Sequence, residues 1–579
     1  MEPQEQSFGK LGCNVNASEL DNAIADYLVH NRSKDGFKEV QEQICMRYFL
    51  LWFLSLMFAT MSLGFPKPAR SQSNSPSQFP DSQKYPDPPS RNPSSGGFNP
   101  LILLNLINSL SRSGNNDQQQ VDLSPDIAEI RGQIGRLYFL LARQYAAQNQ
   151  LPQACNALEK GYSAELEAYL RKRLRSPKPD SDDCYASEVQ SISKLTGSPT
   201  ALIYVTTSKG GLEIIGVPPA SPNRPAGIFS RTRIGAKSLE EKIGLPIAQT
   251  NQSSGTPFRK VAYNATTEEV DRVIIDFRNN LRDTSSNDFL PQSQQLYDWV
   301  VRPMEPELEK AQVKTLVFVM NGNLRVVPPA AFHDGKRYLV EKYAVVTIPS
   351  WQLTEPNHPD RALTPQILAM GLSESVEGWS PLPATKVEVE MISSQVLVGK
   401  TFMNRDFTKD NLRSQISSQN FGIIHLATHA KFVKNSPEES FIQFWGDRLQ
   451  MNQISKMNLV TDLLTLSACE TAVGQNLGLA GLAVDSGAKS VLASLWTVSD
   501  AGTAPLMIRF YRGLPTAPSK AIALQEAQLA FLRGEVTIKN NQIIGVKGFP
   551  NIPFLIDTRD VDLKHPFFWS SFTLVGNWL

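Results

Sequence analysis

The last third of the sequence contains a histidine and a cysteine whose positions could support nucleophilic catalysis. His429 lies in the segment FGIIHLATHA, and Cys469 follows the apolar segment LLTLSA. A cysteine nucleophile acts as a thiolate, and it needs an imidazole to carry protons and donors to stabilise the oxyanion. The residues after Cys469 could begin a helix, whose amino terminus would favour the thiolate. On spacing alone, a small buried cysteine remains the commoner interpretation.

The two segments belong to a series of apolar, β-branched stretches separated by helical patterns. Helical periodicity covers residues 268–282 and about 293–312. The strand-like stretches are ALIYVTT (201–207), LEIIGV (212–217), TLVFVM (315–320), YAVVTIP (343–349), QILAMGL (366–372), FGIIHLA (421–427), LLTLSA (463–468) and SVLASLW (490–496). This alternation predicts an α/β fold with a mainly parallel sheet that helices cover on both faces. We therefore expect His429 and Cys469 at the carboxyl ends of strands, where such sheets place their catalytic groups.

A helical hairpin is predicted before the α/β region, over residues 125–178. Ser124 and Pro125 are typical of a helix start, and a second helix begins at Leu151. The stretch LYFLLARQYAAQNQLPQACNALEKGY is similar to one tetratricopeptide repeat, with small alanines where two helices would cross. Such repeats bury their faces against neighbours, so a single unit cannot stand alone. We expect this hairpin to dock on the catalytic body, where it could also contact a protein partner.

The sequence before the hairpin changes composition twice. Residues 65–124 are rich in proline, serine and asparagine and predict a disordered linker, interrupted by a short apolar segment at 101–110. Residues 46–64 are almost continuously apolar, and their length is near the lower limit of a bilayer span. This segment predicts membrane association through residues 46–65 or entry into a secretory pathway.

Two interpretations of this apolar segment stay open. In one, it anchors the protein in a membrane, and residues 1–45 form an N-terminal extension that is a cytoplasmic tail. In the other, translation begins at Met46, residues 1–45 are not made, and MRYFLLWFLSLMFATMSLG is a signal peptide with small residues near its end. The second interpretation is slightly favoured. The protein is accordingly expected to be secreted or periplasmic, or anchored by a single membrane span.

The overall composition excludes several classes of protein. The 579 residues include 57 lysines and arginines and 56 acidic residues, so no excess of positive charge indicates a nucleic-acid partner. The five cysteines form no C-x-x-C pair, and the histidines show no H-E-x-x-H spacing, so neither a zinc site nor a cofactor is predicted. Outside the cytosol, Cys155 and Cys184 could form a disulfide bond, which is a hypothesis from compartment alone.

Four motifs in the last part of the chain together resemble a known family. They are IIHLATHAKF, LLTLSACETAVG, GAKSVLASLWTVSDAGTAPLM and HPFFWSSFTLVGNWL, and the upstream pieces LVFVMNGNLRVVPPAAFHDGKRYLVEKYAVVTIPS and WSPLPATKVEVEMI agree with them. This order is similar to that of the CHAT domain, a caspase-like family of clan CD peptidases that often accompanies tetratricopeptide repeats. The resemblance covers residues 195–579 and implies a cysteine endopeptidase that cleaves a protein or peptide substrate without a metal or other cofactor.

The resemblance also implies roles for individual residues. His429, the second histidine of HLATHA, matches the catalytic histidine, and Cys469 matches the nucleophile. The backbone N–H groups of Ala430 and Cys469 would hold the oxyanion. Family members usually carry glycine at the position of Ala430, and an alanine there would weaken oxyanion binding if the turn required a positive φ.

Substrate contacts are predicted less sharply. The related separases place an acid after the LW motif to receive a basic side chain, and here Asp500 and Trp496 are the candidate substrate-binding residues. A second acid found in separases is replaced by Ala504, and Asp500 could equally cap the helix that follows. A catalytically silent CHAT module acting as a protein-binding scaffold is therefore the alternative function, and a transferase with the same dyad also remains open.

Overall fold

The structure is a computed structural model that describes residues 123–174, 179–221, 255–354, 356, 365–433, 436–469, 486–496, 498, 500–546, 549–553 and 561–579. The predicted extension 1–45, the apolar segment 46–64 and nearly all of the predicted linker 65–124 lie outside these residues. None of the described helices has the length and apolar character that a bilayer span requires.

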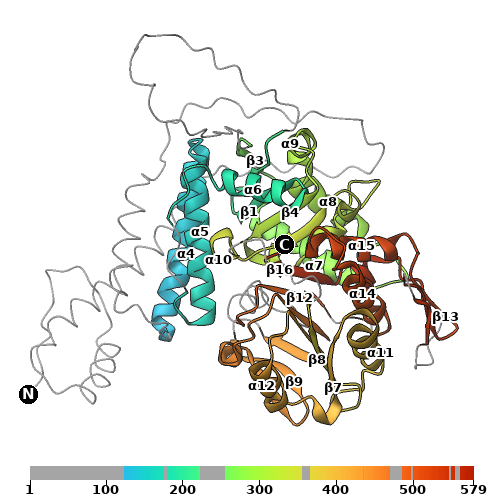
Figure 1. The fold of residues 1–579 in the computed structure, drawn as a ribbon. Coiled ribbons are helices and arrows are strands. Elements are labelled where there is room, and N and C mark those ends of the chain that lie inside the picture. Colours follow the sequence, from blue (N-terminus) through green and yellow to red (C-terminus); the bar gives the residue numbers. More distant parts are fainter. Residues whose placement is uncertain are drawn as a thin grey trace, which may run out of the picture. The chain divides into compact units, whose positions relative to one another are not determined.

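Thirteen of the described strands form one sheet (Figure 1). Its main path runs in the order β10-β9-β8-β11-β12-β16-β5-β4-β1-β2-β3, while β6 pairs with both β8 and β7. The strands are β1 (Thr200–Ser208), β2 (Gly211–Val217), β3 (Phe258–Ala262), β4 (Thr315–Met320), β5 (Ala344–Thr347), β6 (Ile367–Gly371), β7 (Gly399–Met403), β8 (Ile423–Val433), β9 (Ser436–Phe444), β10 (Asp447–Gln450), β11 (Leu463–Cys469), β12 (Ser490–Ser494) and β16 (Phe572–Gly576). A separate small sheet contains β13 (Thr537–Lys539), β14 (Gln542–Val546) and β15 (Phe549–Pro553).

Most neighbouring strands of the large sheet are parallel, while β12–β16, β8–β9, β9–β10, β1–β2 and β2–β3 are antiparallel. The parallel pairs are β7–β6, β6–β8, β8–β11, β11–β12, β16–β5, β5–β4 and β4–β1. The fully buried patterns of β4, β6 and β12 follow from the continuous apolar runs in their sequences. The predicted α/β fold with a mainly parallel sheet is thereby confirmed.

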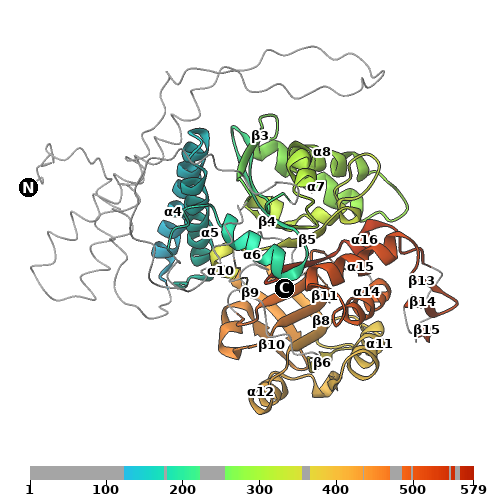
Figure 2. The ribbon, with the colours of Figure 1, turned by 45° about the horizontal axis from the view of Figure 1, so that its top comes forward.

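Helices cover both faces of the sheet. The described helices are α4 (Pro125–Ala147), α5 (Leu151–Leu170), α6 (Ala186–Thr196), α7 (Thr267–Leu281), α8 (Leu290–Val300), α9 (Glu305–Lys310), α10 (Trp351–Thr354), α11 (Ala384–Met391), α12 (Lys409–Ser418), α14 (Asp500–Gly513), α15 (Lys520–Leu532) and α16 (Pro566–Trp569). α11 leads from β6 outward to β7, and α12 returns from β7 to β8. Right-handed crossovers in opposite directions place the two helices on opposite faces, as Figure 2 shows.

The helical hairpin α4–α5 is locked together and docked on the sheet by specific residues. The Ser124 side chain caps α4 by accepting a hydrogen bond from the Ile127 N–H. Where the helices cross, a Cβ on Gly161 would lie 2.9 Å from the Phe139 ring, so the glycine permits the close approach. Buried Glu159 of α5 accepts a hydrogen bond from the Tyr204 hydroxyl of β1.

A disulfide bond between Cys155 of α5 and Cys184 adds a covalent connection to the hairpin. The Cα atoms are 5.5 Å apart, and both side chains are fully buried. The pairing proposed for these two cysteines is therefore found in the structure. It ties the helical hairpin to the segment that enters α6 and β1.

Three local features differ from the sequence prediction or extend it. The helix expected over 293–312 is broken into α8, a 3₁₀ turn at Arg302–Met304 and α9. Pro303 and Pro306 lack the N–H groups that a continuous helix would need there. β8 does not end near His429 but continues to Val433. Residues 537–546, to which no strand was assigned, form a hairpin of β13 and β14, which Asn540 and Asn541 connect with positive φ angles.

Candidate functional site

His429 and Cys469 lie side by side on neighbouring parallel strands. β8 and β11 pair in register from Ile423 and Leu463 up to His429 and Cys469, which form the last pair of this ladder. Adjacent strands of a sheet are about 4.8 Å apart, so the backbones of these two residues are neighbours. The structure thus brings the predicted dyad residues together at the carboxyl edge of the parallel strands.

The imidazole of His429 is held by two residues from the loop between β6 and α11. Its Nε2 atom is 2.9 Å from the Ser380 carbonyl oxygen. The Trp379 ring stacks on the imidazole, with ring centroids 4.7 Å apart and an angle of 20° between the planes. His429 is 5% exposed, so almost all of its surface is covered by protein. These contacts fix both the plane and the rotation of the ring.

A tight turn presents Trp379 to the histidine. Glu377 and Gly378 both have positive φ angles, and the Trp379 N–H donates to the Val376 carbonyl oxygen at 2.8 Å. The Glu377 carboxylate accepts a hydrogen bond from the Gln443 side chain of β9 at 3.2 Å. The turn is therefore attached to the strand that pairs with the end of β8.

Burial and hydrogen bonding determine the protonation of His429. Burial lowers its pKa below the ordinary value near 6.5, and the hydrogen bond with the Ser380 carbonyl opposes this shift in part. A carbonyl oxygen only accepts hydrogen bonds, so Nε2 must carry a proton. In the neutral imidazole, Nδ1 is then the basic nitrogen, which is free to receive a proton from a thiol.

A buried polar cluster lies four residues below the dyad on the same two strands. His425 and Thr465 are register partners, and the Tyr511 hydroxyl of α14 lies 3.0 Å from the Nδ1 of His425 and donates to the Thr465 hydroxyl at 2.6 Å. The Nε2 of His425 lies 3.1 Å from a carboxylate oxygen of Glu388 on α11, although the geometry falls short of a hydrogen bond. His425 is fully buried.

The other predicted site residues lie around the same edge. Ala430 is buried within β8 and pairs with Ile442 of β9, so its backbone is extended and has no need of a glycine conformation. Asp500 is the first residue of α14. Trp496 is 3% exposed, and its indole N–H donates to the Phe567 carbonyl oxygen at 3.3 Å. Ala504 is fully buried in α14.

Sequence reasoning assigned no role to Trp379 or Ser380. Both belong to WSPLPATKVEVEMI, which was used only as support for the family resemblance. A role for the two residues could not be assigned from that motif. The Ser380 contact is made by a backbone carbonyl, which any residue could supply. Only the folded loop shows that these two residues face His429.

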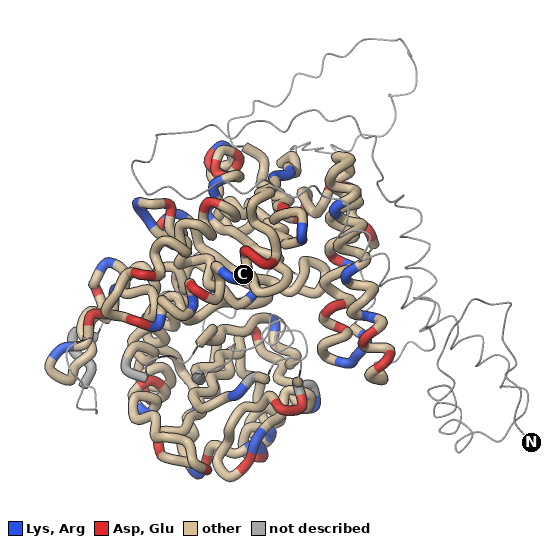
Figure 3. The backbone as a smooth tube through the Cα atoms, turned by 180° about the vertical axis from the view of Figure 1, so that it is seen from behind, with Lys and Arg blue, Asp and Glu red and all other residues tan. Residues whose placement is uncertain are grey.

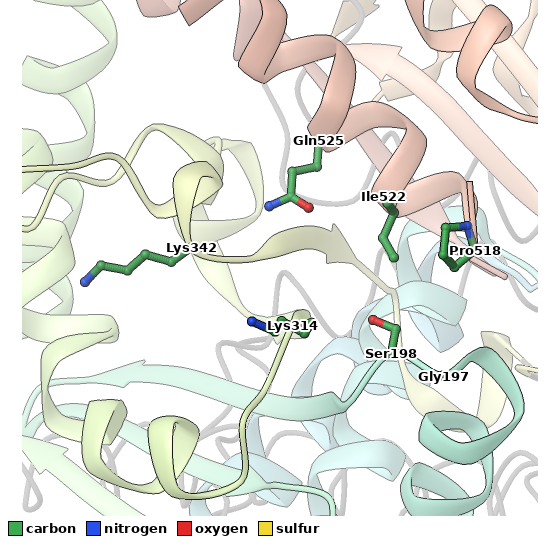
Figure 4. Close-up of a pocket in the computed structure, with 7 residues that line it drawn as sticks. All are labelled: Gly197, Ser198, Lys314, Lys342, Pro518, Ile522 and Gln525. Atoms are coloured by element: carbon green, nitrogen blue, oxygen red, sulfur yellow. The ribbon is translucent and has the colours of Figure 1, made fainter. Parts of the chain in front are cut away.

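A cavity of about 290 Å³ lies at the opposite edge of the sheet (Figure 4). It is bordered by Ser198 before β1, Lys314 before β4 and Ile522 of α15. These positions precede parallel strands, whereas His429 and Cys469 follow them, so the cavity is remote from the candidate dyad. Among the residues that the structure describes, no group of three or more His, Cys, Asp or Glu side chains could hold a metal ion.

Comparisons with known proteins give a match to a family model and likenesses to solved structures, two of which are named below. Residues 290–577 match the model of the CHAT domain. The separase–securin complex of Saccharomyces cerevisiae resembles the chain with 11% identity and a TM-score of 0.39, covering 83% of this chain and 37% of that chain. The Arg specific cysteine proteinase gingipain R resembles it with 10% identity and a TM-score of 0.31, covering 53% of this chain and 73% of that chain. No curated protein matches by sequence.

Proposed function

Residues 290–577 of this chain form a CHAT domain, and from this premise we propose that the protein is a cysteine endopeptidase that uses Cys469 and His429. The observation that carries the proposal is their position as the last register pair of β8 and β11. Nucleophilic cysteine catalysis needs a thiol and an imidazole within reach of each other. The position of the two residues on neighbouring strands is consistent with this requirement. The proposed substrate is a peptide bond of a protein.

The proposed reaction follows from the orientation of the His429 ring. Nδ1 takes the proton of the Cys469 thiol, and the sulfur attacks the carbonyl carbon of the scissile bond. Nδ1 then gives that proton to the leaving amine nitrogen as the C–N bond breaks, which leaves a thioester on Cys469. Water attacks the thioester, His429 accepts its proton, and the C–S bond breaks to release the acid and regenerate the thiol. Backbone N–H groups of Ala430 and Cys469 are the proposed oxyanion donors.

Ser380 and Trp379 support this role for the imidazole. The carbonyl of Ser380 keeps the proton on Nε2, so that the basic nitrogen is Nδ1. The stacked Trp379 excludes water from one face of the ring and limits its rotation. No third ionised side chain is required for this arrangement.

The test is cleavage of a diverse peptide library by the full chain, by Cys469→Ala and by His429→Ala. We expect turnover from the unmodified protein and none from either variant. Labelling with a thiol-directed peptidyl electrophile provides a second readout, in which Cys469 should react faster than the other cysteines. Absence of both turnover and selective labelling would reject the peptidase and favour the alternative, a CHAT module that binds proteins without cleaving them.

We further propose that the folded part of the protein functions outside the cytosol. The buried disulfide between Cys155 and Cys184 supports this, because such bonds persist in oxidising compartments and are rare in reducing ones. Trapping free thiols with an alkylating agent in intact cells should leave these two cysteines unmodified. Their complete alkylation would contradict the proposed location.

A further inference from the structure

Arg278, near the end of α7, is a half-buried cation that pairs with no carboxylate among the described residues. Its guanidinium donates a hydrogen bond to the Leu495 carbonyl oxygen at 3.1 Å. By contrast, Arg272 of the same helix is exposed and forms ion pairs with Glu269 and Asp276. Leaving a partly desolvated charge without a counterion is costly. The environment of Arg278 therefore favours the binding of an anion to its guanidinium.

The contact with Leu495 places Arg278 close to the candidate dyad. β12 lies beside β11, with Ala493 in register with Leu466. Leu495 directly follows Ser494, the last residue of β12, and Cys469 is the last residue of the neighbouring strand β11. The guanidinium thus lies at the carboxyl edge of the sheet, one strand away from the proposed nucleophile.

The surroundings of Arg278 would strengthen its attraction for an anion. Burial lowers its pKa to about 10, with a contribution from the like charge of Arg282, so it remains charged at neutral pH. Trp496, which follows its hydrogen-bond partner, stacks with half-buried Phe567 at 6.3 Å between ring centroids. Charge interactions are stronger beside such apolar groups than in bulk water.

The proposed attraction for an anion comes from Arg278 itself and not from a large region of positive charge. Figure 3 shows lysines and arginines interspersed with acidic residues along the described backbone. A long-range field of one sign is not needed to select a substrate, because a single guanidinium at the cleavage edge can do so by direct contact.

We propose that Arg278 binds a carboxylate of the substrate chain, so that the peptidase prefers substrates with an acidic group next to the scissile bond. This inference rests on the proposed function, because it concerns the specificity of the same site. It differs from the preference for a basic side chain that the similarity of Asp500 to the separase acid would imply. The carboxylate could belong to an Asp or Glu side chain or to a free chain end, and the experiment separates these sources.

The experiment compares capped peptides that differ only by Asp or Asn, or by Glu or Gln, beside the cleaved bond. We expect the unmodified full chain to have a kcat/KM about tenfold to a hundredfold higher for the acidic peptides, which is the range of a hydrogen bond between charged groups. Arg278→Gln should reduce this ratio to near one, and Arg278→Lys should keep part of it. Arg272→Gln is the matched control and should leave the ratio unchanged. An unchanged ratio in a folded Arg278→Gln would overturn the proposal.

A binding measurement separates this inference from the proposed catalysis. Fluorescence anisotropy with Cys469→Ala tests whether acidic peptides bind more tightly than their amide counterparts, with and without Arg278→Gln. An acidic preference that depends on Arg278, in a protein without turnover, would support the carboxylate site and reject only the peptidase. The same peptides with free and amidated C-termini identify the source, since a preference confined to free ends would assign the carboxylate to the chain terminus. Equal binding of acidic and neutral peptides would reject the site.

Discussion

His429 stacks against Trp379 with ring centroids 4.7 Å apart, while its Nε2 is 2.9 Å from the carbonyl oxygen of the next residue, Ser380. Two consecutive residues therefore hold one imidazole from its face and from its edge. The loop that carries them begins after β6 and leads into α11. The orientation of the proposed proton carrier thus depends on a segment that contributes no reacting atom.

Replacing Trp379 tests the effect of this stacking. We expect Trp379→Leu to lower kcat/KM by about two- to tenfold, the equivalent of the 0.5–1.5 kcal/mol of an aromatic pair. Trp379→Phe keeps a flat ring and should retain most of the activity. Steady-state kinetics on one cleaved peptide provide the comparison. If the leucine and phenylalanine variants were equally active, the stacked ring would have no part in positioning His429.

The lowered pKa of His429 predicts a specific dependence of stability on pH. Its pKa is below 6.5 in the folded state because burial disfavours the charged ring. The unfolded chain therefore binds more protons as the pH falls through 6.5, and the free energy of unfolding should decrease until the folded pKa is reached. His429→Gln should show a smaller decrease than the unmodified protein in urea denaturation between pH 8 and pH 5. His333 and His565 also have pKa values lowered by burial, so part of the decrease should remain in the variant.

The same shift predicts the acidic limit of catalysis. Neutral His429 is the proton acceptor in the proposed reaction, so its lowered pKa should keep the enzyme active somewhat below pH 6.5. The acidic limb of kcat/KM against pH should move upward in Trp379→Leu, because removal of the indole exposes the imidazole to water. A limb that lies above pH 6.5 in the unmodified protein would contradict this assignment.

Sequence patterns predicted the central strands well because those strands are buried on both faces. TLVFVM and LLTLSA are continuous apolar runs, and each became a parallel strand of the large sheet. β7, with the sequence GKTFM, was not predicted, because it is an edge strand with exposed residues and no apolar run. The contacts of Trp379 and Arg278 were also beyond sequence reasoning, since both depend on loops and helices from distant parts of the chain.

Removal of the disulfide should destabilise the folded protein. The bond closes a loop with a sequence separation of 29 residues, and restricting the unfolded chain to this extent contributes roughly 3–4 kcal/mol. Cys155→Ala with Cys184→Ala should lower the urea midpoint accordingly. A reducing agent should lower the midpoint of the unmodified protein toward the same value and leave the double variant unchanged. Equal midpoints for both proteins under oxidising conditions would contradict the prediction.

The buried cluster below the dyad offers the last test. Tyr511→Phe removes the hydroxyl that connects His425 with Thr465, and it leaves both side chains without that partner inside the protein. We expect a loss of about 1–3 kcal/mol in the free energy of unfolding, the usual cost of leaving buried polar groups unsatisfied. Tyr263→Phe is the matched control, because Tyr263 is 66% exposed and its variant should unfold like the unmodified protein. Since His425 and Thr465 lie four residues before His429 and Cys469 on the same strands, Tyr511→Phe should also reduce kcat more than it changes KM. A stable Tyr511→Phe variant with full kcat would show that the cluster neither stabilises these strands nor positions the dyad.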